Sequence, residues 1–145
     1  MATKGFLTGP ELAKAKMRSI GGASRGRVNW DMAKDKAKAA GLTVSGFNKK
    51  FGPRMDGLRD ICQSVDELCK LHGVEPNGID AEWKTAIKQR ADLVQEAADH
   101  YRNECDRKAE KHPEQKKEWA ALKRAVGVAL SNANSGCSKY GPKVN

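Results

Sequence analysis

The side chains best suited to chemistry in this 145-residue chain are its four cysteines and three histidines. Cys62 and Cys69 stand seven residues apart on one face of an expected helix, and His72 follows Cys69 by three. This spacing differs from the close CxxC pairing of zinc ribbons, so we expect no metal site and small apolar side chains in a core. A disulfide between Cys62 or Cys69 and Cys105 is geometrically conceivable, but with no signal peptide evident we expect free thiols.

Two residue pairs come closest to an acid–base or nucleophile arrangement: Asp99 with His100, and Cys105 with His112. Both pairs lie on or beside an expected helix that is rich in charges, so we expect solvated side chains there rather than a reaction centre. The sequence holds no glycine-rich phosphate loop, Gly-x-Ser-x-Gly motif or His-Glu-x-x-His motif. We therefore predict a protein that is not an enzyme and that uses no cofactor, metal ion or small-molecule substrate.

Basic side chains are concentrated in the first third of the chain. Residues 1–52 hold 11 basic and 3 acidic residues, a net charge of +8, whereas residues 53–145 hold 16 basic and 15 acidic residues, a net +1. This asymmetry indicates a segment that faces a polyanion, most commonly nucleic acid, with an acidic protein surface or anionic lipid as the alternatives. The expected phosphate contacts are Arg25, Arg27, Lys34, Lys38 and Lys49.

Helices must position these residues, and the longest is predicted over 79–111. Apolar side chains recur there in steps of three or four, while charged side chains occupy the opposite face. Asn77 is the expected N-cap. His112 precedes Pro113 and should end the helix, because a residue before proline avoids the α region.

Two further helices complete a predicted antiparallel bundle. Residues 113–133 carry a second apolar stripe that folds back along the long helix, and Asn134-Ser135-Gly136 is its expected stop. Residues 54–72 carry a third stripe, which Gly73 should end. The predicted fold class is therefore all-α, with short basic N-terminal helices followed by a three-helix bundle that contains one long helix. The predicted core anchors are Trp30, Trp83 and Trp119.

The long helix is predicted to carry more apolar surface than its neighbour can cover. The helix that follows it is clearly shorter, so part of the stripe is free for another element or another subunit. This predicts self-association as a homo-oligomer. The expected interface residues are Ile87, Ala91, Val94, Ala98 and Tyr101.

Three segments with different roles are expected along the chain. Residues 1–52 form a basic arm, in which Ala23–Arg27 is a small, flexible linker before a helix over 30–40. Residues 53–136 form the helical association module, and residues 137–145 form an extended tail that suits a docking peptide. No hydrophobic run is long enough to span a membrane. We expect a cytoplasmic protein, or a virion component if the chain comes from a phage.

The stretch over 37–51 resembles a helix-turn-helix of the AraC type. Ala37 would pack beneath the turn that Gly41 makes, and the serine, phenylalanine, basic and phenylalanine pattern over 45–51 would build the recognition helix. In such a motif the second helix lies in the major groove of DNA. The resemblance implies that the residues facing DNA are Val44, Ser45, Asn48 and Lys49.

Two functional interpretations fit these observations. The first is a DNA-binding helical protein whose basic head grips phosphates while the hairpin oligomerises it. This layout is similar to that of phage small terminase subunits. The second is a phage virion, assembly or adaptor protein whose basic N-terminal arm laces across acidic surfaces of neighbouring subunits. It would lie extended over residues 1–52, with Phe47 and Phe51 anchored in a partner.

Overall fold

The computed structural model describes residues 25–39 and 51–145, with side chains for 30–35, 37–39 and 51–145. Within these ranges every regular element is a helix, which confirms the all-α prediction. The principal helices are α2 (Arg25–Ala39), α3 (Phe51–His72), α4 (Ala81–Lys111) and α5 (Lys116–Cys137). Short 3-10 turns precede α4, join it to α5 and follow α5: η2 (Pro76–Gly78), η3 (Pro113–Gln115) and η4 (Ser138–Tyr140).

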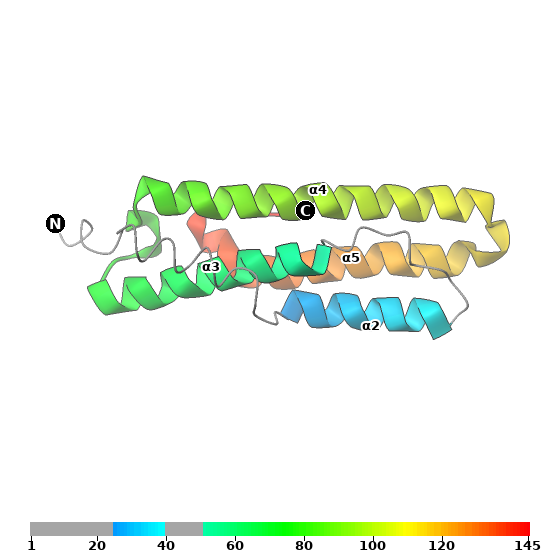
Figure 1. Cartoon of the computed structure of the whole chain (residues 1–145), viewed down its shortest axis with the longest axis horizontal. Helices are drawn as coiled ribbons and strands as arrows, with labels where there is room; N and C mark the ends of the chain where they lie inside the picture. Colours follow the sequence, from blue (N-terminus) through cyan, green and yellow to red (C-terminus); the bar gives the residue numbers. More distant parts are fainter. Residues whose placement is uncertain (1–24, 40–50) are drawn as a thin grey trace.

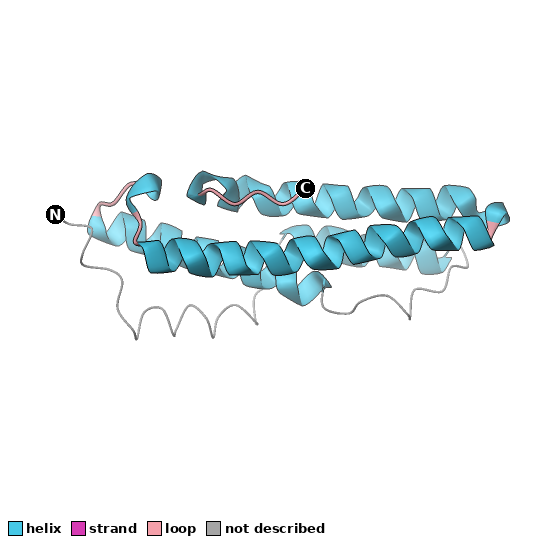
Figure 2. Ribbon diagram, turned by 90° about the horizontal axis from the view of Figure 1, so that it is seen from above, coloured by secondary structure: helices cyan, strands magenta, loops and turns pink. Residues whose placement is uncertain are grey.

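The predicted antiparallel hairpin is formed by α4 and α5, which run the length of the molecule (Figure 1). Helix α3 packs against both of them, and α2 packs along α5 and meets α3. Because α3 and α2 lie one after the other, each accompanies a different half of the hairpin. Figure 2 shows the same bundle from above, with residues 141–145 running back along the hairpin. One side of the hairpin is therefore covered by α3 over one half of its length and by α2 over the other half.

A single apolar core joins all four helices. Trp30, Trp83 and Trp119 are each at most 2% exposed, which confirms their prediction as core anchors. On α2, Ala37 is buried and Ala33 packs against the same core. Small side chains of this kind let two helices approach closely, so α2 can lie directly on α5. The described part of the predicted N-terminal arm thus shares its core with the hairpin.

Both N-terminal helices begin earlier than predicted. Helix α2 starts at Arg25, so Arg25 and Arg27 belong to a helix and not to a flexible linker. Helix α3 starts at Phe51, and Pro53 lies in its first turn, where a missing N–H costs no hydrogen bond. Trp30 and Phe51 are buried in the core. Burial of these two side chains stabilises the N-terminal turns of α2 and α3. Such long-range contacts cannot be recognised from the residues near a helix start.

The prediction that Asn77 caps the long helix was wrong. Helix α4 begins at Ala81, and Asp80 rather than Asn77 occupies its N-cap position. Asn77 lies within the η2 turn, where the Gly78 N–H donates to the Glu75 carbonyl oxygen at 2.8 Å. A turn closed in this way separates Asn77 from the first amides of α4.

Helix α3 ends at Gly73, as predicted. The glycine has a φ of 64°, a left-handed conformation that other residues adopt at a cost. The N–H of Val74 then donates to the Cys69 carbonyl oxygen at 2.9 Å, which satisfies one of the last carbonyl groups of the helix.

Helix α5 continues to Cys137, through the Asn134-Ser135-Gly136 sequence that was predicted to end it. Among the described residues only Gly73 and Gly141 have a positive φ, so Gly136 does not make the expected left-handed stop. Cys137 is 1% exposed. Burying this further residue favours another helical turn, and tertiary packing therefore outweighs the local stop signals.

Candidate functional site

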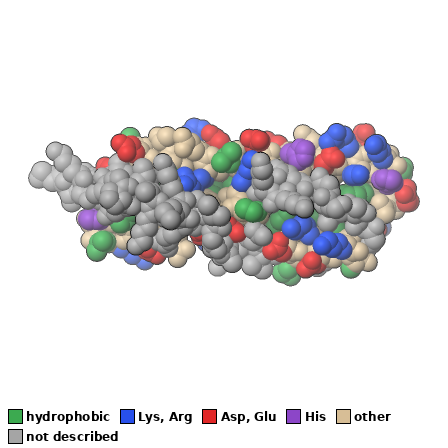
Figure 3. All heavy atoms as spheres, viewed as in Figure 1, with side chains coloured by type: hydrophobic (Ala, Val, Ile, Leu, Met, Phe, Trp, Pro, Cys, Tyr) green, Lys and Arg blue, Asp and Glu red, His purple; other side chains and the backbone are tan. Residues whose placement is uncertain are grey.

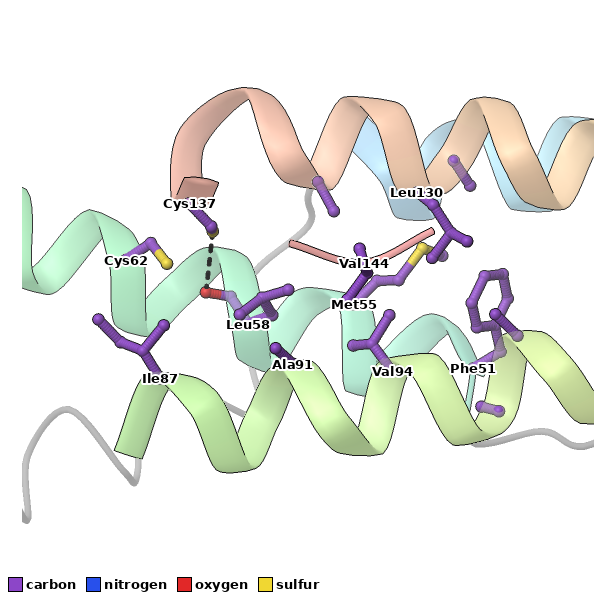
Figure 4. Close-up of a cluster of buried hydrophobic side chains, with 14 of the residues drawn as sticks. Phe51, Met55, Leu58, Cys62, Ile87, Ala91, Val94, Leu130, Cys137 and Val144 are labelled. Carbon is purple, nitrogen blue, oxygen red and sulfur yellow. Dashed lines mark hydrogen bonds between the residues drawn. The ribbon is translucent and has the colours of Figure 1, made fainter. Parts of the chain in front are cut away.

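The five residues predicted to form a subunit interface lie inside the bundle. Ile87, Val94 and Ala98 have no exposed surface, and Ala91 and Tyr101 are at most 5% exposed. Figure 4 shows three of them pointing from α4 toward side chains of α3 and α5. The assignment of these residues to an interface is therefore wrong, because α3 and α2 cover the part of the stripe that α5 leaves open.

Three aromatic rings from three helices fasten α2 and the start of α3 to α4. The Trp30 ring lies 5.0 Å from Phe51 and 4.8 Å from Tyr101, and Phe51 lies 5.5 Å from Tyr101, measured between ring centres. The edge-on arrangement of Trp30 and Phe51 is one of the favoured geometries for aromatic pairs. Phe51 packs in its own chain here, whereas the assembly interpretation expected it to anchor in a partner.

Two of the predicted phosphate contacts have described side chains, and their surroundings differ. The Lys34 ammonium lies 3.4 Å from the Asp31 carboxylate and 6.0 Å from the centre of a Trp30 ring. Lys38 is exposed and has no ion pair among the described side chains. Lys38 is therefore the more available of the two lysines for a polyanion.

The side chains of the other predicted phosphate and DNA contacts are not among those that the structure describes. Arg25 and Arg27 are backbone-defined residues of α2. Val44, Ser45, Asn48 and Lys49 lie outside the described residues, as do Gly41 and Phe47 of the helix-turn-helix resemblance. That resemblance stays a prediction, since its turn and recognition helix fall in the same stretch.

The described bundle surface mixes both signs of charge (Figure 3). Ion pairs cross-link neighbouring turns and helices, as between Lys88 and Asp92 at 3.1 Å and between Lys123 and Asp106 at 2.9 Å. Such exposed pairs contribute little to stability because water screens them. Residues 53–145 are close to neutral because their 16 basic and 15 acidic residues nearly balance.

Two side-chain amides hold the tail, here residues 141–145, against the hairpin. Asn134 of α5 donates to the Val144 carbonyl oxygen at 2.6 Å and accepts from the Val144 N–H at 2.9 Å. Gln95 of α4 donates to the Asn145 carbonyl oxygen at 2.8 Å and accepts from the Asn145 N–H at 2.7 Å. Each amide thus pairs with a residue's N–H and C=O as a neighbouring strand would.

This tail clamp was not predicted from the sequence. Asn134 was expected to belong to a helix stop, and no role was expected for Gln95. A weak signal was present, because Val144 is the one branched aliphatic residue in the tail. Val144 is 2% exposed. The predicted docking peptide therefore docks on its own bundle.

The η4 turn is fastened to α3 just before the tail. The Tyr140 hydroxyl donates to the Asp66 carboxylate, and the Lys139 ammonium lies 2.9 Å from the same group. Burial raises the pKa of Tyr140, and the Asp66 carboxylate raises it further. The phenol therefore stays protonated at neutral pH and remains a donor to Asp66.

A groove of about 470 Å³ lies between the tail and α4. Its polar lining includes Lys84, Lys88 and Lys143, and its apolar lining includes Ala91 and Val144. Asp92 also lines the groove and pairs with Lys88 at 3.1 Å, so the groove carries both signs of charge beside its apolar surface. This lining supplies charge and contact area rather than a nucleophile paired with a base.

All four cysteines are buried, which confirms their prediction as core residues. Burial raises the pKa of Cys105 to about 12. The pKa of Cys62 is raised by a hydrogen bond with Cys137 and by burial. Because the thiolate is the reactive form, these two thiols are poor nucleophiles at neutral pH. The neighbour of Cys62 is Cys137, a pair that the sequence analysis did not consider.

In the described ranges, no group of three or more His, Cys, Asp or Glu side chains is arranged to hold a metal ion. None of the helices described is both long and apolar enough to cross a membrane. No protein-family model matches the chain, and no curated protein or solved structure is significantly similar to it.

Proposed function

We propose that this chain is a non-enzymatic nucleic-acid-binding protein whose basic first third contacts phosphates. One observation carries the proposal: residues 1–52 have a net charge of +8, and residues 53–145 a net charge of +1. Neutralising phosphates with lysine and arginine releases condensed counterions, which drives association without any need for base contacts. The helical bundle is the platform that carries this segment.

The attachment of α2 supports the proposal. Trp30 fastens α2 to the core while Lys38 stays exposed on its outer side. Arg25 and Arg27 belong to the same helix, so they share its fixed backbone. Basic groups on a fixed helix lose less conformational freedom on binding than groups on a free chain, which favours affinity.

Homo-oligomerisation remains part of the proposal, on different residues. The apolar stripe of α4 is already buried, so an interface between copies would use the outer surfaces of the bundle. A charged substitution at Val94 would not test assembly. Val94 has no exposed surface, so the substitution would unfold the core. Light-scattering mass of the unaltered chain, alone and with DNA, is the informative measurement.

The test is a DNA titration at two salt concentrations. Fluorescence anisotropy of a labelled 20-base-pair duplex should show binding that weakens between about 50 and 200 mM salt, by roughly a factor of ten or more for several phosphate contacts. Lys34→Ala/Lys38→Ala/Lys49→Ala should lower affinity and flatten the salt dependence. A helical spectrum and melting temperature close to those of the unaltered chain would show that the variant is folded.

A matched control removes the same charge from the other part of the molecule. Lys84→Ala/Lys88→Ala/Lys143→Ala deletes three groove lysines that lie outside the basic first third. It should leave DNA affinity nearly unchanged under the proposal. Equal losses in both triple variants would show that overall charge matters and not the N-terminal segment. Absence of any complex at low salt would contradict nucleic-acid binding and favour the assembly interpretation.

A further inference from the structure

One face of α3 contacts the end of α5 and the following η4 turn at three successive helical turns. Leu58, Cys62 and Asp66 stand four residues apart and so share this face. Cys137 Sγ lies 3.6 Å from the Leu58 carbonyl oxygen (Figure 4). Asp66 accepts the hydroxyl of Tyr140. Between these two contacts, Cys62 projects from the same face of α3, and Figure 4 shows its thiol beside the end of α5 that carries Cys137.

We propose that Cys62 and Cys137 form a dithiol–disulfide pair, and that oxidation covalently joins the end of α5 to α3. The inference rests on the packing of the two helices and is independent of the proposed nucleic-acid binding. The pair is specific to these two residues. Cys69 contacts Tyr140, and Cys105 lies on α4 beside Asp106.

The backbone around Cys137 suits the closure. Disulfides need Cα atoms about 5.5–6 Å apart and Cβ atoms about 3.8 Å apart, so one of the two residues must be able to adjust. Cys137 is the last residue of α5, and its φ of −122° and ψ of −23° already depart from a regular helix. Cys62 lies in the middle of α3 and stays fixed. The adjustment therefore falls on the end of α5.

The reaction requires an oxidant, and a hydroperoxide is the chemical class we assign. A thiolate of the pair attacks one peroxide oxygen, the O–O bond breaks, and the sulfur becomes a sulfenic acid. The second thiolate attacks that sulfur, the S–S bond forms, and hydroxide leaves. In total the two thiols lose two electrons and two protons, and hydrogen peroxide is reduced to two waters.

Because both thiols are buried, this reaction is slow and takes place in molecules in which this part of the bundle has opened. Cys62 is 2% exposed and Cys137 is 1% exposed. Hydrogen peroxide therefore meets them when the end of α5 and the η4 turn move away from α3. Once the disulfide forms, it holds the same segment down and opposes further opening.

The experiment uses the full chain in dilute solution with hydrogen peroxide. After oxidation the chain is unfolded and its remaining thiols are alkylated, and the intact mass should show two of the four cysteines unmodified by alkylation. Peptide mapping should find the Cys62 peptide joined to the Cys137 peptide. The melting temperature should rise by roughly 5–10 °C, because a long loop is closed in the unfolded state. Dithiothreitol should restore four thiols and the original melting temperature.

Two variants separate the pair from the other buried thiols. Cys69→Ser/Cys105→Ser retains the pair and should give the same linked peptide and the same upward shift. Cys62→Ser should give neither. Peptide mapping of the unaltered chain decides the question even if a variant fails to fold. Four alkylated thiols after oxidation, a linkage through Cys69 or Cys105, or sulfinic acid without a linkage would overturn the proposal.

Discussion

The bundle holds its two outlying segments by different forces. Helix α2 is fastened by apolar contacts, chiefly the ring of Trp30 against Phe51 and Tyr101. The tail is fastened by hydrogen bonds between its backbone and the amides of Asn134 and Gln95, with Val144 as its one buried side chain. The attachment of α2 depends on aromatic side chains that the sequence shows directly. The attachment of the tail depends mainly on its backbone groups, which every sequence has.

The difference matters for how each segment can move. Burial of a tryptophan contributes several kcal/mol and couples α2 to the stability of the whole core. A hydrogen bond to the backbone contributes roughly 1 kcal/mol net, because water competes for the same groups. We therefore expect α2 to detach only when the bundle unfolds, and the tail to open locally while the bundle stays folded.

The largest effect should come from Trp30→Ala. Removing this buried ring leaves a cavity where three helices meet, so we expect a loss of about 3–5 kcal/mol in the free energy of unfolding. Urea denaturation followed by circular dichroism measures it. Trp30→Phe is the control, since it keeps a ring and should lose much less. A loss below about 1 kcal/mol for Trp30→Ala would show that α2 is not coupled to the core in this way.

A smaller and more local effect is expected from Asn134→Ala. The variant removes two hydrogen bonds and leaves the N–H and C=O of Val144 without their partner, a loss of roughly 1–3 kcal/mol confined to the tail. Amide hydrogen exchange at Val144 should speed up while exchange in α4 changes little. The control is Asn103→Ala, at an exposed position on α4. Equal acceleration throughout α4 would contradict local opening.

The smallest effect should separate two glycines of α5. Gly127 is exposed, and an added Cβ would meet nothing within 4 Å, so Gly127→Ala should raise the free energy of unfolding by about 0.5–1 kcal/mol. At Gly136 an added Cβ would overlap the Arg59 guanidinium, which also bonds the Asn132 carbonyl oxygen at 3.5 Å. Gly136→Ala should therefore gain less or lose stability. Thermal melts of both variants measure the contrast, and equal gains would contradict it.

The helix positions could be predicted because they depend on local pattern. The stripes of α3, α4 and α5, the break at Pro113 and the stop at Gly73 all follow from side-chain period and backbone preference. The boundaries were less predictable, since α2, α3 and α5 are extended by the burial of Trp30, Phe51 and Cys137 against residues far away in sequence. Local signals such as Asn77 and Gly136 are outweighed where the packed structure favours a different helix end.

The candidate site was predictable in a different way. Net charge belongs to composition, so the basic character of residues 1–52 follows from the sequence alone. Which lysine is available does not, because Lys34 is engaged by Asp31 and Trp30 while Lys38 is exposed. The clamp of Asn134 and Gln95 was also missed. Amide side chains bond to any backbone, so their partners depend on where the tail lies.

Local pattern was enough to predict a helical protein, the places of its main helices and the third of the chain that is basic, because helical period, proline, glycine and charge act over a few residues. What covers the long helix depends on tertiary packing. Whether a stripe such as Ile87 to Tyr101 faces a partner or its own chain depends on how α2 and α3 divide its length, and that division results from packing among residues far apart in the chain.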